Sequence, residues 1–330
     1  MAVIIWYGGN KVLGGALTFG VVFAFTQYVQ QFYRPLMSLA DRYGQIQTAM
    51  ASAERIFELL EEKPAITNHP QAKRFPEKIP GRIEFKNVWF AYNEGEWVLK
   101  DVSFTVEPGQ TVAFVGATGA GKSSIINLIN RFYDIQKGSV KIDGEDIRQI
   151  AIDDLRKHVA IIQQDPFIFS GDVRYNIKLN RDMSDEELIE AAKSLNMHEF
   201  IMKLPQQYDT MLGEQGYTLS SGQKQLLSFL RAAVYNPDIL ILDEATANID
   251  TETEIVVQEA LKRISQNRTT LIVAHRLSTI QHADKIIVLK KGEIQEVGNH
   301  EELLKNKGYY YRLHEVQQQK ERDQKQRVTV

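Results

Sequence analysis

The chain has 330 residues, a formal net charge of −3 and 43% hydrophobic residues, which fits one large or two small globular domains. Because acidic and basic residues nearly balance, no basic surface for nucleic acid is expected, and nucleic-acid partners are set aside. The chain contains no cysteine, which excludes disulfides and thiolate metal sites and suits a reducing compartment.

The first predicted element is a membrane helix over about residues 12–34. Residues 12–33 form a run of 22 positions without a charge, and at about 1.5 Å per residue such a helix spans about 33 Å, close to one bilayer core. Phe32, Tyr33 and Arg34 provide an aromatic and basic anchor at the membrane interface. The alternative is a buried core helix, which gains weight from three glutamines, Gln27, Gln30 and Gln31.

The segments on either side of this run are less apolar or shorter. Residues 2–7 are apolar but too short to cross a membrane, and we expect them to be the end of a preceding helix. Residues 35–62 have apolar side chains at helical spacing and predict a long amphipathic helix. Four of the nine prolines then fall within residues 63–80, which predicts an extended linker. Residues 1–62 resemble the end of an α-helical membrane domain, with residues 35–62 as its cytosolic extension.

From residue 81 onward, alternating strand and helix patterns predict an α/β domain over residues 81–313, followed by a polar tail at 314–330. Its most informative segment is a glycine-rich turn between a strand-like run and a helix-like run. Such a turn lets backbone N–H groups and a helix N-terminus surround a phosphate. The residues of this predicted cradle are Gly116, Ala117, Thr118, Gly119, Ala120, Gly121, Lys122, Ser123 and the following Ser124.

Polar side chains follow three further apolar runs of this domain. Residues 239–242 lead into Asp243 and Glu244, and residues 159–162 lead into Gln163 and Gln164. A third run ends at His275. In open α/β sheets the carboxyl ends of the strands form the ligand-binding edge. The acidic pair also fits the start of a helix, but its position directly after four strand residues favours a place at this edge.

Residues 219–223 read Leu-Ser-Ser-Gly-Gln, a turn of small residues before a helical pattern. With this segment the chain resembles the nucleotide-binding domain of an ATP-binding cassette (ABC) transporter. The resemblance implies an α/β P-loop NTPase fold with a helical signature subdomain, an ATP and Mg²⁺ site and ATP hydrolysis. Six motifs occur in the family's order: Walker A at 116–123, the Q-loop at Gln164, the signature at 219–223, Walker B at 239–244, the D-loop at 247–250 and the switch histidine at His275.

The resemblance also implies a role for each matching residue. Tyr92 matches the aromatic residue that stacks on adenine, although strand amphipathicity alone accounts for its position beside Trp89 and Phe90. Lys122 would contact the β- and γ-phosphates. The metal would be held by Ser123, Gln164 and Asp243. Catalytic roles fall to Glu244 as general base, His275 as γ-phosphate partner and Gln164 as sensor. The signature residues Ser220, Gly222 and Gln223 would bind nucleotide held by a second subunit.

The uncharged N-terminal run decides which kind of ABC protein is expected. It favours a half-transporter of the multidrug or lipid exporter type, in the bilayer of a cell membrane with its ATPase domain in the cytoplasm. A soluble ATPase subunit that docks on a separate permease is the alternative, and a module that binds ATP without turnover is a third. Because Ser221 stands where the family usually has glycine, we expect a heterodimer with a second half-transporter, with a symmetric homodimer as the alternative.

Overall fold

The computed structural model describes residues 1–163, 165–179, 181–213, 217–243, 251–273 and 280–328. The chain divides into two compact units, Met1–Ala65 and Ile66–Val330, called here the N-terminal and C-terminal units. Each is described by itself.

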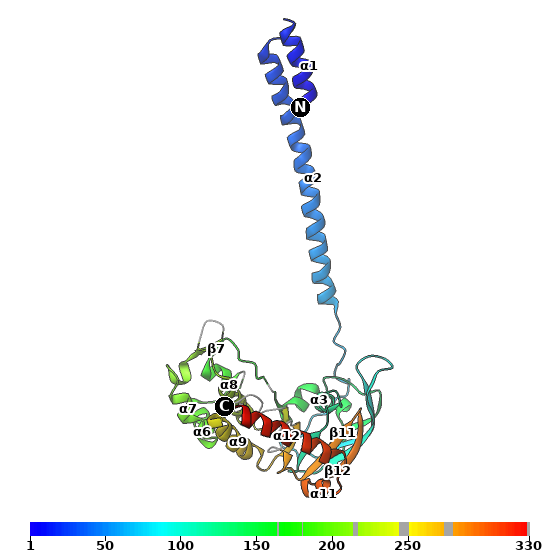
Figure 1. Cartoon of the computed structure of the whole chain (residues 1–330), viewed down its shortest axis with the longest axis vertical. Coiled ribbons are helices and arrows are strands. Elements are labelled where there is room, and N and C mark those ends of the chain that lie inside the picture. The colour runs from blue at the N-terminus through cyan, green and yellow to red at the C-terminus, as the bar shows by residue number, and fades with distance from the viewer. Residues whose placement is uncertain (164, 180, 214–216, 244–250, 274–279, 329–330) are drawn as a thin grey trace. The chain divides into compact units, whose positions relative to one another are not determined.

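The N-terminal unit consists of two helices, α1 (Ala2–Leu13) and α2 (Phe19–Glu61) (Figure 1). They pack closely at Gly8, where a Cβ atom would lie 2.8 Å from a methyl group of Val22. Every residue of α2 is at least partly exposed, so this helix contributes no core of its own. The predicted amphipathic helix at 35–62 is confirmed as the second part of α2, which continues through Pro35.

The prediction of a single membrane helix over residues 12–34 is wrong. The uncharged run holds the end of α1, a turn at 14–18 and only the first 15 residues of α2, from Phe19 to Tyr33. Gly15 adopts a φ of 75°, a left-handed conformation that ends the helical path at little cost for glycine. Over the residues that the structure describes, no helix combines the length and the apolarity that crossing a membrane requires.

The segment between the units is extended, as the prolines predict, but it is not a free linker. The unit boundary falls after Ala65, so residues 66–80 belong to the C-terminal unit. Lys73 N–H donates to Gln149 O at 2.8 Å, and Ala151 N–H donates to Lys73 O at 2.9 Å. The predicted start of this domain at residue 81 is therefore some fifteen residues late.

The centre of the C-terminal unit is a six-stranded sheet in the order β12-β11-β3-β10-β9-β6. Neighbouring strands from β11 to β6 run parallel, and β12 pairs antiparallel with β11. The strands span Thr111–Val115 (β3), Val159–Ile162 (β6), Ile239–Asp243 (β9), Thr269–Val273 (β10), Lys285–Lys290 (β11) and Glu293–Gly298 (β12).

The parallel strands are continuous apolar runs because both faces of the sheet are covered. Along β9, Ile239 and Ile241 face one core, and Leu240 and Leu242 face the other. The first core is shared with α3 (Lys122–Ile129) and with a four-stranded antiparallel sheet. That sheet has the order β2-β1-β4-β5, with strands Trp97–Val106 (β2), Ile83–Ala91 (β1), Lys137–Ile142 (β4) and Glu145–Asp146 (β5).

The second core packs against helices, which confirms the predicted helical region before the signature. These helices are α5 (Val173–Lys178), α6 (Asp185–Ser194), α7 (His198–Met202), α8 (Ser221–Tyr235) and α9 (Thr251–Ser265). Shorter elements are η1 (Ile147–Gln149), α4 (Ile152–His158), β7 (Gly171–Asp172), η2 (Gln207–Asp209), β8 (Met211–Leu212) and α11 (His300–Lys305). Residues 314–328 of the predicted polar tail lie within α12 (Tyr309–Val328), whose first turns are anchored by the buried Tyr310 and His314.

Candidate functional site: a phosphate cradle at the edge of the sheet

The turn between β3 and α3 can be formed only by glycine at two positions. A Cβ atom on Gly116 would lie 2.3 Å from Leu289 O, a backbone atom that cannot move aside. Gly121 has a φ of 103°, and a Cβ there would lie 2.6 Å from a methyl group of Leu99. The loop therefore passes tightly against β2 and β11, while Thr118 and Gly119 stay exposed at its crest.

The helix that follows this turn has its N-terminus directed into it. Gly121 is the N-cap of α3 and supplies no side-chain cap, and the N-terminal end of a helix is where backbone N–H groups favour an anion. Lys122 is 6% exposed, and its Nζ donates to Gly116 O at 2.8 Å and to Ala117 O at 3.2 Å. The ammonium group thus lies within the curl of the loop, where phosphate oxygens would bind.

Tyr92 lies beside the start of α3, as the predicted adenine site requires. Its hydroxyl accepts a hydrogen bond from Asn127 Nδ2 at 3.2 Å and lies 3.1 Å from Ser124 Oγ. The ring is half exposed and meets Tyr133 edge to face at 4.9 Å between centroids. The sequence analysis did not single out Asn127 and Tyr133. These contacts give Tyr92 a fixed place next to the cradle and leave ring surface free to stack.

Asp243 ends its strand at the same edge of the sheet as the cradle. In register, Asp243 pairs with Val273 on β10, and Val273 pairs with Phe114 on β3. On the other side of β9, Ile162 of β6 is aligned with Leu242. The chain thus leaves β3, β6, β9 and β10 at one level, which is the ligand-binding edge of open α/β sheets.

Three of the predicted catalytic or metal-binding residues follow these strand ends directly, namely Gln164, Glu244 and His275. They lie outside the described residues, as does the predicted D-loop at 247–250. The described strands nevertheless fix where the chain enters each of these segments: Gln164 follows β6 by two positions, Glu244 follows Asp243, and His275 follows β10 by two positions.

The signature residues form the start of α8 and are bonded to one another. Ser220 is the N-cap: its Oγ accepts from Gln223 N–H at 3.3 Å, and Gln223 Oε1 accepts from Ser220 N–H at 3.0 Å. Gly222 is buried in the first turn. Figure 1 shows α8 among the helices of the unit and α3 apart from it, beside the strands. The chain therefore does not bring its own signature onto its own cradle.

The residues of the cradle fit a nucleotide with Mg²⁺. The loop is too tight for side chains at Gly116 and Gly121, as expected where backbone surrounds phosphate. Mg²⁺ prefers hard oxygen ligands and keeps several of them from water and phosphate, so one hydroxyl and one carboxylate suffice from the protein. The exposed Ser123 hydroxyl and the half-buried Asp243 carboxylate would supply these.

The segment after β6 carries exposed apolar side chains. Phe167 is 67% exposed and meets Phe169 edge to face at 4.9 Å. Arg231 of α8 fixes this segment, because its guanidinium donates to Phe167 O at 2.6 Å and lies 5.5 Å from the Phe169 ring centre. The loop is held in place while the Phe167 ring is left without a covering layer, which is typical of a docking surface.

Comparison with known proteins agrees with this geometry. Residues 99–247 match the family model described as ABC transporter. The C-terminal unit therefore carries an ATPase domain of the ABC transporter family. The recognition of an ABC cassette from six ordered motifs is confirmed.

The relatives narrow the kind of transporter that this chain is similar to. A probable multidrug resistance ABC transporter ATP-binding/permease protein of Bacillus subtilis is 48% identical over 317 residues, covering 95% of this chain and 47% of that protein. An ATP-dependent lipid A-core flippase of Syntrophus aciditrophicus is 45% identical over 318 residues, covering 96% and 53%. A solved structure of a bacterial Atm1-family ABC exporter with ATP bound matches with a TM-score of 0.75 at 38% identity, covering 92% of this chain and 53% of that one. The chain thus spans about half the length of these relatives.

Proposed function

We propose that this chain is the ATP-binding and hydrolysing part of an ABC exporter, in which two cassettes close head to tail around ATP and Mg²⁺ and drive export. The observation that carries the proposal is the cradle between β3 and α3, with Lys122 inside it and Asp243 on the same sheet edge. The match with an ATP-binding/permease protein covers 95% of the chain and therefore extends into the N-terminal unit, which favours an exporter over a soluble subunit of a separate permease.

In this proposal each group at the cradle has a definite task. Backbone N–H groups of the loop and the Lys122 ammonium bind the β- and γ-phosphates, and Tyr92 stacks on adenine. Ser123 and Asp243 hold Mg²⁺, which neutralises charge on the phosphates when bound. Gln164, Glu244 and His275 complete the set: Glu244 takes the proton of the attacking water, and the other two position water and γ-phosphate.

The signature of this chain acts on a partner's nucleotide in this arrangement, because α3 and α8 lie apart within one chain. Ser221 adds a hydroxymethyl group where the family usually has glycine. Since Ser221 is the first residue of α8 and has no positive φ, the substitution adds bulk but no backbone strain. We infer that the partner's site turns over slowly and that the complex is a heterodimer with unequal sites, in a membrane with the cassettes in the cytoplasm. The substrate class follows the relatives: drugs or lipids.

The experiment is ATPase assay of the full-length protein, alone and together with a candidate partner half-transporter, in detergent and in liposomes. The proposal expects Mg²⁺-dependent hydrolysis that requires two cassettes and responds to transported compounds. Turnover by a monomeric cassette at the full rate would contradict the head-to-tail arrangement, and full symmetric turnover at two sites by this chain alone would contradict the heterodimer.

A further inference from the structure

Residues 66–81, called here the linker strap, are bonded along the side of the C-terminal unit. Besides the pairing of Lys73 with Gln149 and Ala151, Phe75 N–H donates to Asp154 Oδ2 at 2.5 Å. The Phe75 ring meets His158 edge to face at 5.5 Å between centroids. Asp154 and His158 are both buried residues of α4. The strap is therefore fastened along α4, the helix that leads into β6 and toward Gln164.

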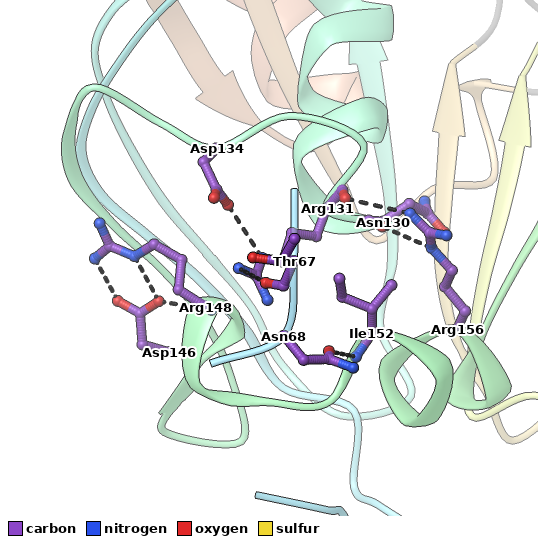
Figure 2. A network of polar contacts seen from close by, with 9 residues as sticks. All are labelled: Thr67, Asn68, Asn130, Arg131, Asp134, Asp146, Arg148, Ile152 and Arg156. Carbon is purple, nitrogen blue, oxygen red and sulfur yellow. Dashed lines mark hydrogen bonds and ion pairs between the residues drawn. The ribbon is translucent and has the colours of Figure 1, made fainter. Parts of the chain in front are cut away.

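The strap also caps the beginning of α4. The N-cap residue of this helix is Ala151, which has no side-chain acceptor. Asn68 of the strap replaces it, because Ile152 N–H donates to Asn68 Oδ1 at 2.8 Å (Figure 2). A capping side chain supplied from 84 positions away in sequence ties the helix start to the strap.

A second group of bonds connects the strap to the end of α3. Arg131, just beyond this helix, is only 5% exposed in its side chain. Its Nη2 donates to Thr67 O of the strap at 3.2 Å, and its Nε donates to Asp134 Oδ1 at 3.1 Å. Its Nη1 is buried without a hydrogen-bond partner in the described part of the chain. Arg131 is a buried cation and donates one of its hydrogen bonds to the carbonyl of Thr67. Attachment of the strap and the position of the end of α3 therefore depend on each other.

Arg156 of α4 closes the arrangement. Its Nε and Nη2 donate to Asn130 O and Arg131 O at 3.4 and 3.3 Å. Its guanidinium also lies 5.0 Å from the Phe132 ring centre. These carbonyls are at the C-terminal end of α3, where a cation is favoured by the helix dipole. Figure 2 shows the strap, the end of α3 and the start of α4 meeting at this point.

The two elements joined here are those that carry the cradle and the Q-loop. Lys122 and Ser123 begin α3 at the nucleotide edge, and α3 is only 8 residues long. Displacement of its far end therefore moves its near end as well, because a helix of two turns is stiff. From the adjacent α4 the chain continues through the four residues of β6 to Gln163 and Gln164.

We propose that Thr67 and Asn68 of the linker strap, with Arg131 and Arg156, form a clasp that couples the linker directly to the nucleotide site. Attachment of the strap positions the phosphate-binding helix, and ATP binding in turn tightens the strap. Asn68, Arg131 and Arg156 are thus positioning residues, and the linker is an input to the ATPase separate from the Phe167 surface. This inference rests on the proposed binding of ATP at the cradle.

The test uses the reciprocity of coupled equilibria: if strap attachment favours ATP binding, ATP must favour strap attachment. Asn68 is exposed, so Asn68→Ala leaves the core unchanged and removes only the cap. We expect ATP to bind about fivefold more weakly to the 330-residue chain with this substitution. In the unchanged chain, ATP should slow amide hydrogen exchange at Lys73, Phe75 and Ile152 by about the same factor.

Two matched variants separate coupling from simple destabilisation. Asn68→Asp keeps the acceptor and should bind ATP like the unchanged chain. Arg148→Ala removes an arginine in the same region that pairs only with Asp146, at 2.9 and 2.6 Å, and should leave ATP affinity unchanged. The clasp is contradicted if ATP binds the unchanged chain and the Asn68→Ala chain equally well. It is also contradicted if ATP binds the unchanged chain without slowing amide exchange in the strap. Failure of the unchanged chain to bind ATP would contradict the proposed function, and the clasp with it.

Discussion

Two helices of the C-terminal unit begin in loops of small residues, and they begin differently. The N-terminus of α3 follows Gly121, which leaves the first N–H groups of the helix without a side-chain cap and places an ammonium group in the loop. The N-terminus of α8 is capped by its own Ser220 and Gln223. A helix start without a side-chain cap can direct its first N–H groups at an anion, whereas a capping box satisfies some of these groups within the helix itself.

In the proposed arrangement, these two loops of small residues act on different nucleotides. The cradle at α3 would act on the nucleotide of its own chain, and the start of α8 would act on the nucleotide of a second cassette. Substitutions at the sheet edge and cradle should therefore affect this chain's own site, and substitutions at α8 should affect the partner's. The predictions below test that division.

The largest effect is expected from Glu244→Gln, which removes the proposed general base beside Asp243. ATP binding should persist, because the amide has the same shape, while hydrolysis should fall by about 100-fold or more. Nucleotide trapping by the assembled transporter, measured with labelled ATP, checks both halves of this expectation. An ATPase rate near that of the unchanged transporter would show that Glu244 is not the general base.

Lys122→Ala should weaken binding itself. Hydrogen bonds to charged groups contribute roughly 1.5–3 kcal/mol, so ATP affinity should fall about 10- to 100-fold. Equilibrium titration with fluorescent ATP measures this loss, and Lys86→Ala, which removes an exposed lysine on β1, serves as the control. Equal affinities for both variants would show that Lys122 does not contact the phosphates.

Ser221→Gly addresses the other helix start. If the signature acts on the partner's nucleotide, as proposed, this change should raise turnover of the partner's site and leave ATP binding at this chain's cradle unchanged. The total ATPase rate should rise by no more than the rate of one additional hydrolysing site. The effect is isolated by an ATPase assay of the heterodimer in which Glu244→Gln in this chain inactivates its own site. If Ser221→Gly then gives no increase in the ATPase rate, Ser221 is a neutral variant.

Phe167→Ala should separate transport from hydrolysis. We propose here that the exposed ring receives the membrane domain, so its loss should reduce transport several-fold more than basal ATPase activity. Paired transport and ATPase assays in liposomes measure the ratio. A strictly proportional fall of both activities would contradict the docking role, and Tyr175→Ala, at another half-exposed aromatic residue nearby, is a suitable comparison.

The smallest expected effect concerns the contact between His300 of α11 and Tyr310 of α12. His300 Nδ1 lies 2.7 Å from the Tyr310 hydroxyl. Burial lowers the pKa of His300, and His314 and His282 lower it further against the opposing effect of Glu301. A lowered pKa in the folded state contributes stability above the unfolded value of about 6.5, and this is lost as the pH falls through the folded pKa. Thermal unfolding at about pH 7.5 and pH 5.5 should show a smaller loss for His300→Gln than for the unchanged chain.

The cradle and the strands that surround it were predictable from sequence because their signals are local. A buried strand, glycines at fixed spacing and a helix start are read within some twenty residues, and the structure has β3, the glycine turn and α3 at those positions. The uncharged run at 12–33 was misjudged because length was weighed above local turn signals. Gly14 and Gly15 followed by Thr18 before an apolar run already indicate a helix end and a new start.

The clasp could not be predicted in the same way. Its contacts join Thr67 to Arg131 and Asn68 to Ile152, 64 and 84 positions apart. Neither Asn68 nor Arg131 belongs to a motif, and proline content indicates only that the segment is extended. Which carbonyl or amide an extended segment meets is decided by tertiary packing, which composition does not encode.

The most direct test of the division between the two helix starts is amide hydrogen exchange of the 330-residue chain, kept dilute and monomeric, with and without ATP and Mg²⁺. The account predicts strong protection of residues 116–124 at the cradle and unchanged exchange at residues 220–223 of α8. Protection of the α8 start in the monomer, or an unchanged cradle in a chain that binds ATP, would contradict it.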